Sequence, residues 1–182
     1  MEQITPETAA LSVLAPSGDA VRLDSLWAER PALLVLVRHF GCQFCREQLA
    51  DLRDTFPQVE AAGVQPAVIG NGTPLMAQAF LQETGVEAPL YTDPPREVYR
   101  ALGTKRPSAR VFLQPRQWWN FIRAAARGYF PKAKPQGDPA QLGGVFLVRP
   151  DGSMPYAHRS VLAGDHPSTA EVMRVVRGAA EG

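Results

Sequence analysis

The feature that most constrains the fold is an apolar run that passes directly into a pair of cysteines. Residues 32–40 are mainly apolar and β-branched without polar alternation, a pattern typical of a strand buried on both faces. After the run, apolar side chains recur at the four- and three-residue spacing of one helical face, namely at Cys45, Leu49, Leu52 and Phe56. The sequence therefore predicts a central strand, a short loop carrying Cys42, and a helix that begins at the cysteines.

The other predicted elements alternate between strands and helices. We expect Pro57 to end the cysteine helix, because proline has no backbone N–H to continue it. Thr73 and Pro74 supply a cap and a first-turn proline for a following helix, and Ser168 begins the last one. The pattern places hairpins at residues 11–27 and 144–158, strands at 64–70 and 89–93, and helices at 73–85, 96–103 and from 168.

This order predicts an α/β sandwich with a central mixed β-sheet flanked by helices and an N-terminal β-hairpin. The length of 182 residues suits one domain over residues 1–182, with an insert at about residues 104–143. The longest apolar stretch is far below the roughly 20 residues of a membrane span. The first ten residues have no basic start and no apolar run, so we expect a cytoplasmic protein.

The cysteine pair predicts thiol chemistry. Unpaired N–H groups and the dipole at a helix start favour a thiolate, so Cys42 is the expected nucleophile. Cys45 follows one turn later on the buried stripe and is the expected resolving thiol. After attack on a peroxide, Cys45 would capture the sulfenic acid on Cys42 as a disulfide. Attack on a disulfide would be resolved by the same geometry, so the motif leaves both reactions open.

Two other interpretations of the cysteines remain open. Both can be small core residues. Alternatively, the pair has the spacing of zinc ligands, and His39, His158 and His166 offer further nitrogen ligands. The sequence contains no second Cys-x-x-Cys and no His-x-x-x-His, so we predict no metal site.

Several segments resemble the peroxiredoxin-like branch of the AhpC/TSA superfamily, which includes selenoprotein-U-like and prostamide/prostaglandin F synthase-like proteins. The segments are residues 37–48, 143–152, 156–160 and 163–167. The resemblance implies a thioredoxin-like fold, a redox-active disulfide, an antioxidant thiol oxidoreductase and no metal. The reductant expected with such chemistry is a thioredoxin or a low-molecular-weight thiol, with no bound cofactor.

Further residues are candidates for supporting the nucleophile. Arg38, His39 and Arg46 are expected to shape the local charge, although His39 is equally well explained as a hydrogen-bonded residue under the sheet. Arg159 is a candidate to approach the thiolate, with a solvated strand end as the alternative. The glycine candidates are Gly41, before the nucleophile, and Gly143 and Gly144, which would allow a substrate or the Cys42 loop to approach the backbone closely.

The insert contains a basic, aromatic helix. Residues 104–135 carry eight Lys and Arg and no acidic residue, although the net charge of the chain is only +1. We expect a helix within residues 115–130 that packs its apolar stripe on the core or in a homodimer interface and exposes its arginines. The alternative is a wall over Cys42 that binds an apolar, anionic substrate; its binding residues would be Trp118, Trp119 and Arg123.

The sequence thus predicts a thiol-dependent oxidoreductase that reduces peroxides or hydroperoxides. Reduction of a small organic disulfide or endoperoxide is the alternative reaction, and a redox-sensing binding protein is the non-enzymatic alternative. The basic insert also suggests a nucleic-acid or membrane surface. The near-neutral overall charge and the absence of a recognised nucleic-acid module argue against nucleic acid.

Overall fold

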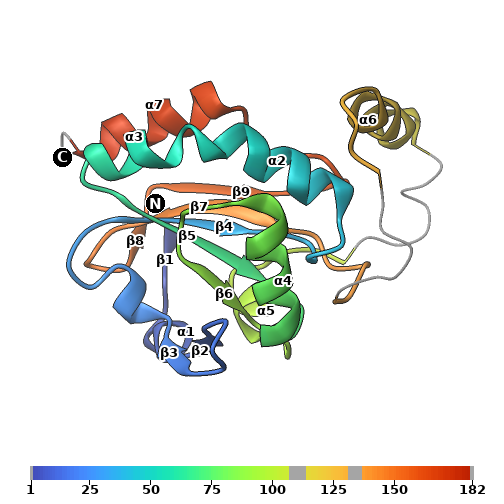
Figure 1. The fold of residues 1–182 in the computed structure, drawn as a ribbon. Helices are drawn as coiled ribbons and strands as arrows, with labels where there is room; N and C mark the ends of the chain where they lie inside the picture. The colour runs from blue at the N-terminus through green and yellow to red at the C-terminus, as the bar shows by residue number, and fades with distance from the viewer. Residues whose placement is uncertain (1, 107–113, 131–136, 181–182) are drawn as a thin grey trace.

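A seven-stranded mixed sheet forms the centre of the computed structural model, which describes residues 2–106, 114–130 and 137–180 (Figure 1). The strand order is β3-β2-β6-β5-β4-β7-β9, and β1 pairs separately with β8. The strands are β1 (Glu2–Gln3), β2 (Ser12–Leu14), β3 (Ala20–Arg22), β4 (Ala32–Leu36), β5 (Gln65–Gly70), β6 (Leu90–Thr92), β7 (Gly144–Val148), β8 (Ser153–Met154) and β9 (Tyr156–Arg159).

Helices cover both faces of this sheet (Figure 1). The helices are α1 (Pro6–Ala9), the 3-10 turn η1 (Asp24–Leu26), α2 (Gln43–Arg53), α3 (Phe56–Ala61), α4 (Pro74–Thr84), α5 (Glu97–Ala101), α6 (Pro115–Ala126) and α7 (Thr169–Ala180). Side chains of α2, α3, α4 and α7 share one apolar core, whereas those of η1 and α5 share another with the N-terminal hairpin strand β2.

Strand β4 explains the uninterrupted apolar run. It is parallel to β5 and antiparallel to β7, so Leu34 pairs with Ala67 on one side and with Phe146 on the other. Leu33 and Val35 face the core of α2, while Leu34 and its neighbours of the same parity face the opposite core. The predicted central strand, mixed sheet and N-terminal hairpin are confirmed.

Three local predictions are confirmed at the ends of helices. The Thr73 hydroxyl accepts a hydrogen bond from the Met76 N–H at 3.3 Å, and α4 ends at Gly85 with a φ of +60°. At the start of α7, the Ser168 hydroxyl accepts from the Glu171 N–H at 3.2 Å. These caps satisfy first-turn N–H groups and fix where the helices begin.

One local prediction is wrong. Helix α2 ends at Arg53, and Pro57 lies in the first turn of α3, a position where a missing N–H costs no hydrogen bond. The predicted hairpin at residues 144–158 is confirmed, because β7 pairs antiparallel with β9, while residues 153 and 154 pair with β1 near the N-terminus.

Most of the predicted apolar stripe of α6 does not pack on the core of this chain, which leaves a homodimer interface as the predicted alternative. Trp118, Trp119 and Ile122 are 60%, 64% and 61% exposed, whereas Gln117 and Asn120 are buried. The two buried side chains bind the backbone of Ala163: Gln117 Oε1 accepts from its N–H at 3.0 Å, and Asn120 Nδ2 donates to its carbonyl at 2.8 Å. Gln117 and Asn120 therefore pack on the protein together with Ala124 and Phe121, whereas Trp118, Trp119 and Ile122 are exposed in this chain.

Candidate redox-active site

The two cysteines lie where the loop after the central strand β4 leads into α2. β4 ends at Leu36, and a turn closed by the Cys42 N–H donating to the His39 carbonyl at 3.0 Å brings Cys42 to the N-cap of α2. Both cysteines are free thiols, and they are only 4% and 3% exposed. The predicted placement of the pair at a helix start is confirmed.

The surroundings of Cys42 favour its thiolate. Burial alone would raise the pKa of Cys42, but hydrogen bonds from the Cys45 thiol and from nearby backbone N–H groups, together with the charge of Arg38, lower it to about 6. The Arg38 Nη1 lies 3.7 Å from the Cys42 sulfur. At pH 7 a thiol with this pKa is roughly 90% ionised, compared with a few per cent for a free cysteine.

Cys45 has the opposite character. Burial, its hydrogen bond to Cys42 and the negative charge on that sulfur together raise the pKa of Cys45 well above its usual value. Its sulfur also accepts a hydrogen bond from the Arg38 N–H at 3.2 Å. The pair therefore consists of one thiolate and one protonated thiol that donates to it.

A network on the far side of Arg38 holds its guanidinium in place. Arg38 donates to the carbonyls of Pro139 and Gln141. The buried Asn71 ties this segment to the cysteine loop, because its Nδ2 donates to the Arg38 carbonyl and its Oδ1 accepts from the Asp138 N–H at 2.8 Å. Asp138 also pairs with Arg106 at 2.8 Å, and with Arg96.

Sequence reasoning missed Asn71 and the segment 138–141. A signal for Asn71 was available, because it directly follows β5, and β5 runs parallel to β4. The carboxyl ends of parallel neighbours meet at the same edge of a sheet, which is where functional groups gather in α/β folds. The segment 138–141 contains no comparable motif, since it acts mainly through backbone carbonyls.

Other predicted supporting residues lie in different environments. His39 is buried, and burial together with Arg38 lowers its pKa to about 4, so it is neutral at neutral pH. Arg46 donates to Glu83 at 2.9 Å and to the carbonyl of Phe130. Of the three predicted charge-shaping residues, only Arg38 acts as a cation on the Cys42 thiol.

Arg159 lies on the opposite face of the sheet. It donates to the Leu102 carbonyl at 2.7 Å, binds the Glu2 carboxylate and lies 5.4 Å over the Phe146 ring. Phe146 belongs to the core on the face away from α2. The approach of Arg159 to the thiolate is therefore wrong, and the residue instead joins the N-terminal strand to the sheet.

The glycines serve the packing of the sheet next to the cysteine loop. A Cβ at Gly143 would lie 1.9 Å from the Leu36 carbonyl oxygen, and one at Gly144 would lie 2.6 Å from the His158 carbonyl oxygen. Glycine is therefore required at position 143, where the end of β4 approaches the backbone closely, and at position 144, where β9 does. Gly41, the last residue before Cys42, is buried in the turn.

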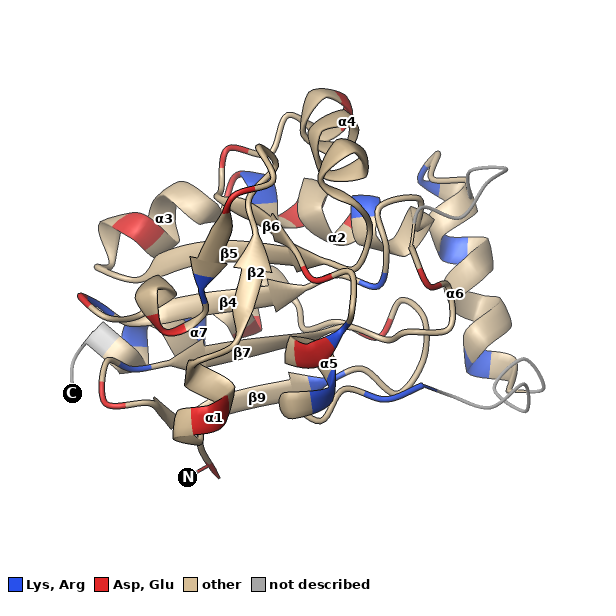
Figure 2. Ribbon diagram, turned by 90° about the horizontal axis from the view of Figure 1, so that it is seen from below, with Lys and Arg blue, Asp and Glu red and all other residues tan. Residues whose placement is uncertain are grey.

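Helix α6 contacts the start of α2 through rings and charges. Phe121 packs edge-on against Phe44, the residue before Cys45, with ring centroids 5.0 Å apart. Arg123 and Arg127 reach Glu47, which is fully buried on α2. Figure 2 shows the basic residues spaced along α6. The predicted binding residues Trp118 and Trp119 are mostly exposed, although the Trp118 ring lies 6.3 Å from that of Phe121, whereas Arg123 reaches Glu47.

Comparisons with known proteins place this chain in a family. A family profile described as AhpC/TSA antioxidant enzyme matches residues 51–161. The chain belongs to this family. Peroxiredoxin-like 2C of Bos taurus is 32% identical to this AhpC/TSA protein over 96% of the chain and 80% of the relative. Prostamide/prostaglandin F synthase of Salmo salar is 33% identical over 78% of the chain and 72% of the relative.

A solved structure supports the fold of this AhpC/TSA protein. Peroxiredoxin Q of Xanthomonas campestris superposes with a TM-score of 0.70 at 15% identity, covering 99% of this chain and 97% of that one. The predicted thioredoxin-like fold is confirmed. Within the described residues, no group of three or more His, Cys, Asp or Glu is arranged to hold a metal ion, and no helix is long and apolar enough to cross a membrane.

Proposed function

We propose that the protein is a thiol-dependent peroxidase in which Cys42 is the nucleophile and Cys45 the resolving thiol. The observation that carries the proposal is the geometry of the pair: Cys42 lies at the N-cap of α2, beside Cys45 and 3.7 Å from the Arg38 Nη1, and these neighbours lower its pKa. In the first step the Cys42 thiolate attacks the terminal oxygen of a hydroperoxide. The O–O bond breaks, the alkoxide leaves and takes a proton, and Cys42 becomes a sulfenic acid.

The second step forms the disulfide. The negative charge of Cys42 contributes to the raised pKa of Cys45, and this charge disappears when Cys42 becomes a neutral sulfenic acid. Oxidation of Cys42 thereby favours ionisation of Cys45, whose thiolate attacks the Cys42 sulfur and releases water. Two electrons from an external thiol, either a thioredoxin-type protein or a low-molecular-weight thiol, restore both cysteines.

The need to reduce the Cys42–Cys45 disulfide again also concerns the cell compartment in which the protein works. A dithiol that cycles in this way needs a reducing environment, and we place it in the cytoplasm or an equivalent thiol-rich compartment. One relative, 27% identical over 90% of this chain, is the chloroplastic thioredoxin-like protein AAED1 of Arabidopsis thaliana. Fractionation of cells expressing the tagged chain is the direct test of this placement.

Stopped-flow fluorescence with hydrogen peroxide tests the chemistry. Reduced protein is mixed with peroxide, and products are identified by mass spectrometry for the wild type, Cys42→Ser and Cys45→Ser. We expect a Cys42–Cys45 disulfide in the wild type, a stalled sulfenic acid in Cys45→Ser and no reaction in Cys42→Ser. If peroxide reacts no faster than with a free thiol, the peroxidase proposal fails. Small organic disulfides and endoperoxides then become the substrates to screen.

A further inference from the structure

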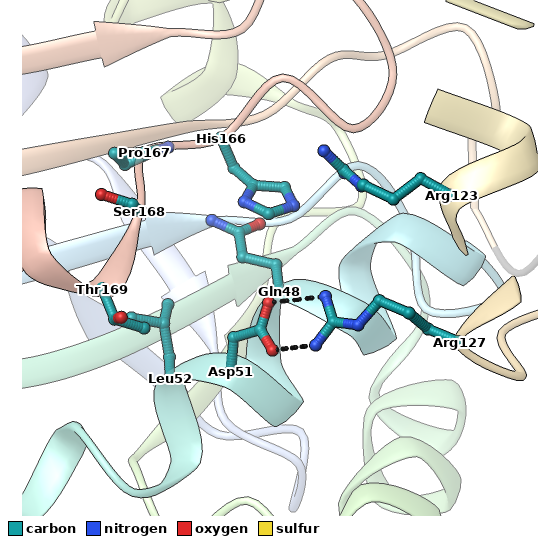
Figure 3. A pocket seen from close by; sticks show the side chains of 9 residues that line it. All are labelled: Gln48, Asp51, Leu52, Arg123, Arg127, His166, Pro167, Ser168 and Thr169. Carbon is teal, nitrogen blue, oxygen red and sulfur yellow. Dashed lines mark hydrogen bonds and ion pairs between the residues drawn. The ribbon is translucent and has the colours of Figure 1, made fainter. Parts of the chain in front are cut away.

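A cavity of about 450 Å³ lies beside the cysteine helix, between α2, α6 and the start of α7 (Figure 3). Its volume is in the range of small-molecule sites. Polar and charged side chains from all three elements line it, including Gln48, Asp51, Arg123, Arg127, His166 and Ser168. Leu52 and Pro167 add apolar surface, so the cavity suits an organic molecule better than an inorganic ion.

The two arginines of the cavity differ in how fully they are paired. Arg127 donates to Glu47 at 2.7 Å and makes a double contact with Asp51, seen as dashed lines in Figure 3. Within the described part of the chain, the contacts of Arg123 are long, 3.3 Å to Glu47 and 3.4 Å to the Gly164 carbonyl. Its Nε has no hydrogen-bond partner among the described residues. Arg123 is therefore the cation in this cavity that is least satisfied by protein acceptors.

The start of α7 forms part of the same wall. Ser168 and Thr169 line the cavity, and the Ser168 hydroxyl is used by the Glu171 N–H. First-turn N–H groups of a twelve-residue helix such as α7 favour a negative charge. Burial and the nearby Arg123 lower the pKa of His166, so the positive charge offered to an anion comes from the arginines and not from this imidazole.

The cavity adjoins the redox pair. Gln48 and His166 line both the cavity and a gap of about 20 Å³ that is also bordered by Cys45 and Arg38. Gln48 follows Cys45 by three residues and so lies on the same side of α2. A molecule held in the cavity would therefore lie next to the gap that borders Cys45 and Arg38.

We propose that this cavity binds the carboxylate of an organic substrate that the cysteine pair reduces, with Arg123 as the main anion partner. The planar guanidinium fork matches a carboxylate, and the apolar lining takes adjoining hydrocarbon. This inference rests on the proposed function and narrows its substrate class to carboxylate-bearing hydroperoxides.

Binding is tested without turnover by NMR titration of the reduced protein with hexanoate and with its neutral counterpart hexanamide. We expect hexanoate to shift the backbone signals of Ser168 and Thr169 and to bind at least tenfold more tightly than hexanamide. Arg123→Gln should weaken hexanoate binding at least tenfold, and Arg123→Lys should weaken it less. Arg53→Gln, which removes the same charge from the exposed side of α2, should leave binding unchanged.

Several results would refute the proposal that this cavity binds a carboxylate. These are absence of hexanoate binding, equal binding of hexanoate and hexanamide, or equal losses in Arg123→Gln and Arg53→Gln. Thermal unfolding of each variant shows whether α6 has loosened. A lower midpoint in both Arg123 variants, with loss of binding only in proportion to the loss of stability, would assign Arg123 a structural role and refute the proposal.

Turnover of linoleic acid hydroperoxide and of its methyl ester separates this inference from the proposed function. We expect kcat/KM to favour the free acid over the ester, and Arg123→Gln to reduce that preference at least tenfold. If hexanoate binds but no hydroperoxide is reduced, the cavity is a carboxylate site and the peroxidase proposal fails. If hydroperoxides are reduced without preference for the acid, the peroxidase proposal stands and the cavity inference fails.

Discussion

Replacing Arg38 by methionine should raise the pKa of Cys42 from about 6 to about 8. The Arg38 Nη1 lies 3.7 Å from the sulfur. At an effective dielectric constant of about 20, unit charges at that distance attract each other by about 4 kcal/mol, which limits the shift to about three units. Cys45 and the backbone donors remain in the variant, so a shift of about two units is the expected value.

The assay is iodoacetamide labelling of reduced protein between pH 4.5 and 9.5, with mass spectrometry to follow Cys42 alone. The readout is the midpoint of the pH profile, because a thiolate with a higher pKa is also intrinsically more nucleophilic and partly offsets the loss in rate. Arg46→Met is the matched control. Arg46 is close in sequence but binds Glu83, so its loss should leave the midpoint in place.

Two results would refute this reasoning. One is a midpoint in Arg38→Met within about 0.5 unit of the wild type, which is far below the shift expected for a charge at this distance. The other is an equal shift in Arg46→Met, which would mean that general positive charge, and not the position of Arg38, lowers the pKa of the thiol.

Three further predictions concern the surroundings of the pair. Asn71→Ala should lower the free energy of unfolding in urea by about 2–3 kcal/mol, because buried hydrogen bonds are lost. It should also move the Cys42 titration midpoint upward, because Arg38 is held less firmly. A lower stability with an unchanged midpoint would contradict the positioning role of Asn71. Glu47→Gln should lower the free energy of unfolding by about 1–3 kcal/mol, since two arginines lose a fully buried partner. Asp51→Asn, at a more exposed carboxylate, should lower it by less than about 1 kcal/mol. Equal losses of stability would argue against the buried ion pair as the anchor of α6. The free energy of unfolding of the reduced protein, measured relative to Cys42→Ser, should rise between about pH 6 and pH 9 by on the order of 4 kcal/mol at most. The reason is that the pKa of Cys42 in the folded protein lies below the usual 9.0, so the unfolded chain binds more protons in this pH range. A difference in urea denaturation that does not change with pH would contradict the lowered pKa.

The sequence by itself determined the elements whose signals are local. The apolar run of β4 and the three- and four-residue spacing after Cys45 depend only on neighbouring residues, so both were predictable. The same holds for the cap at Thr73, where one hydroxyl and one N–H three residues later decide the helix start. The position of Cys42 at the N-cap followed from these elements, and with it the expectation of a lowered pKa.

Only the tertiary structure decided which charges act on the pair and which way α6 faces. An amphipathic pattern shows that a helix has two faces, but the face that packs depends on partners distant in sequence. Here Glu47 is buried on α2, and Arg123 lies opposite it 76 residues later along the chain. Arg123 and Arg127 turn toward α2, although their side chains stay 37% and 44% exposed, because a fully buried carboxylate requires cationic partners, and the tryptophans are left exposed. In the same way, Arg46 is neutralised by Glu83 and Arg38 is fixed by carbonyls near residue 140, contacts that no short sequence pattern encodes.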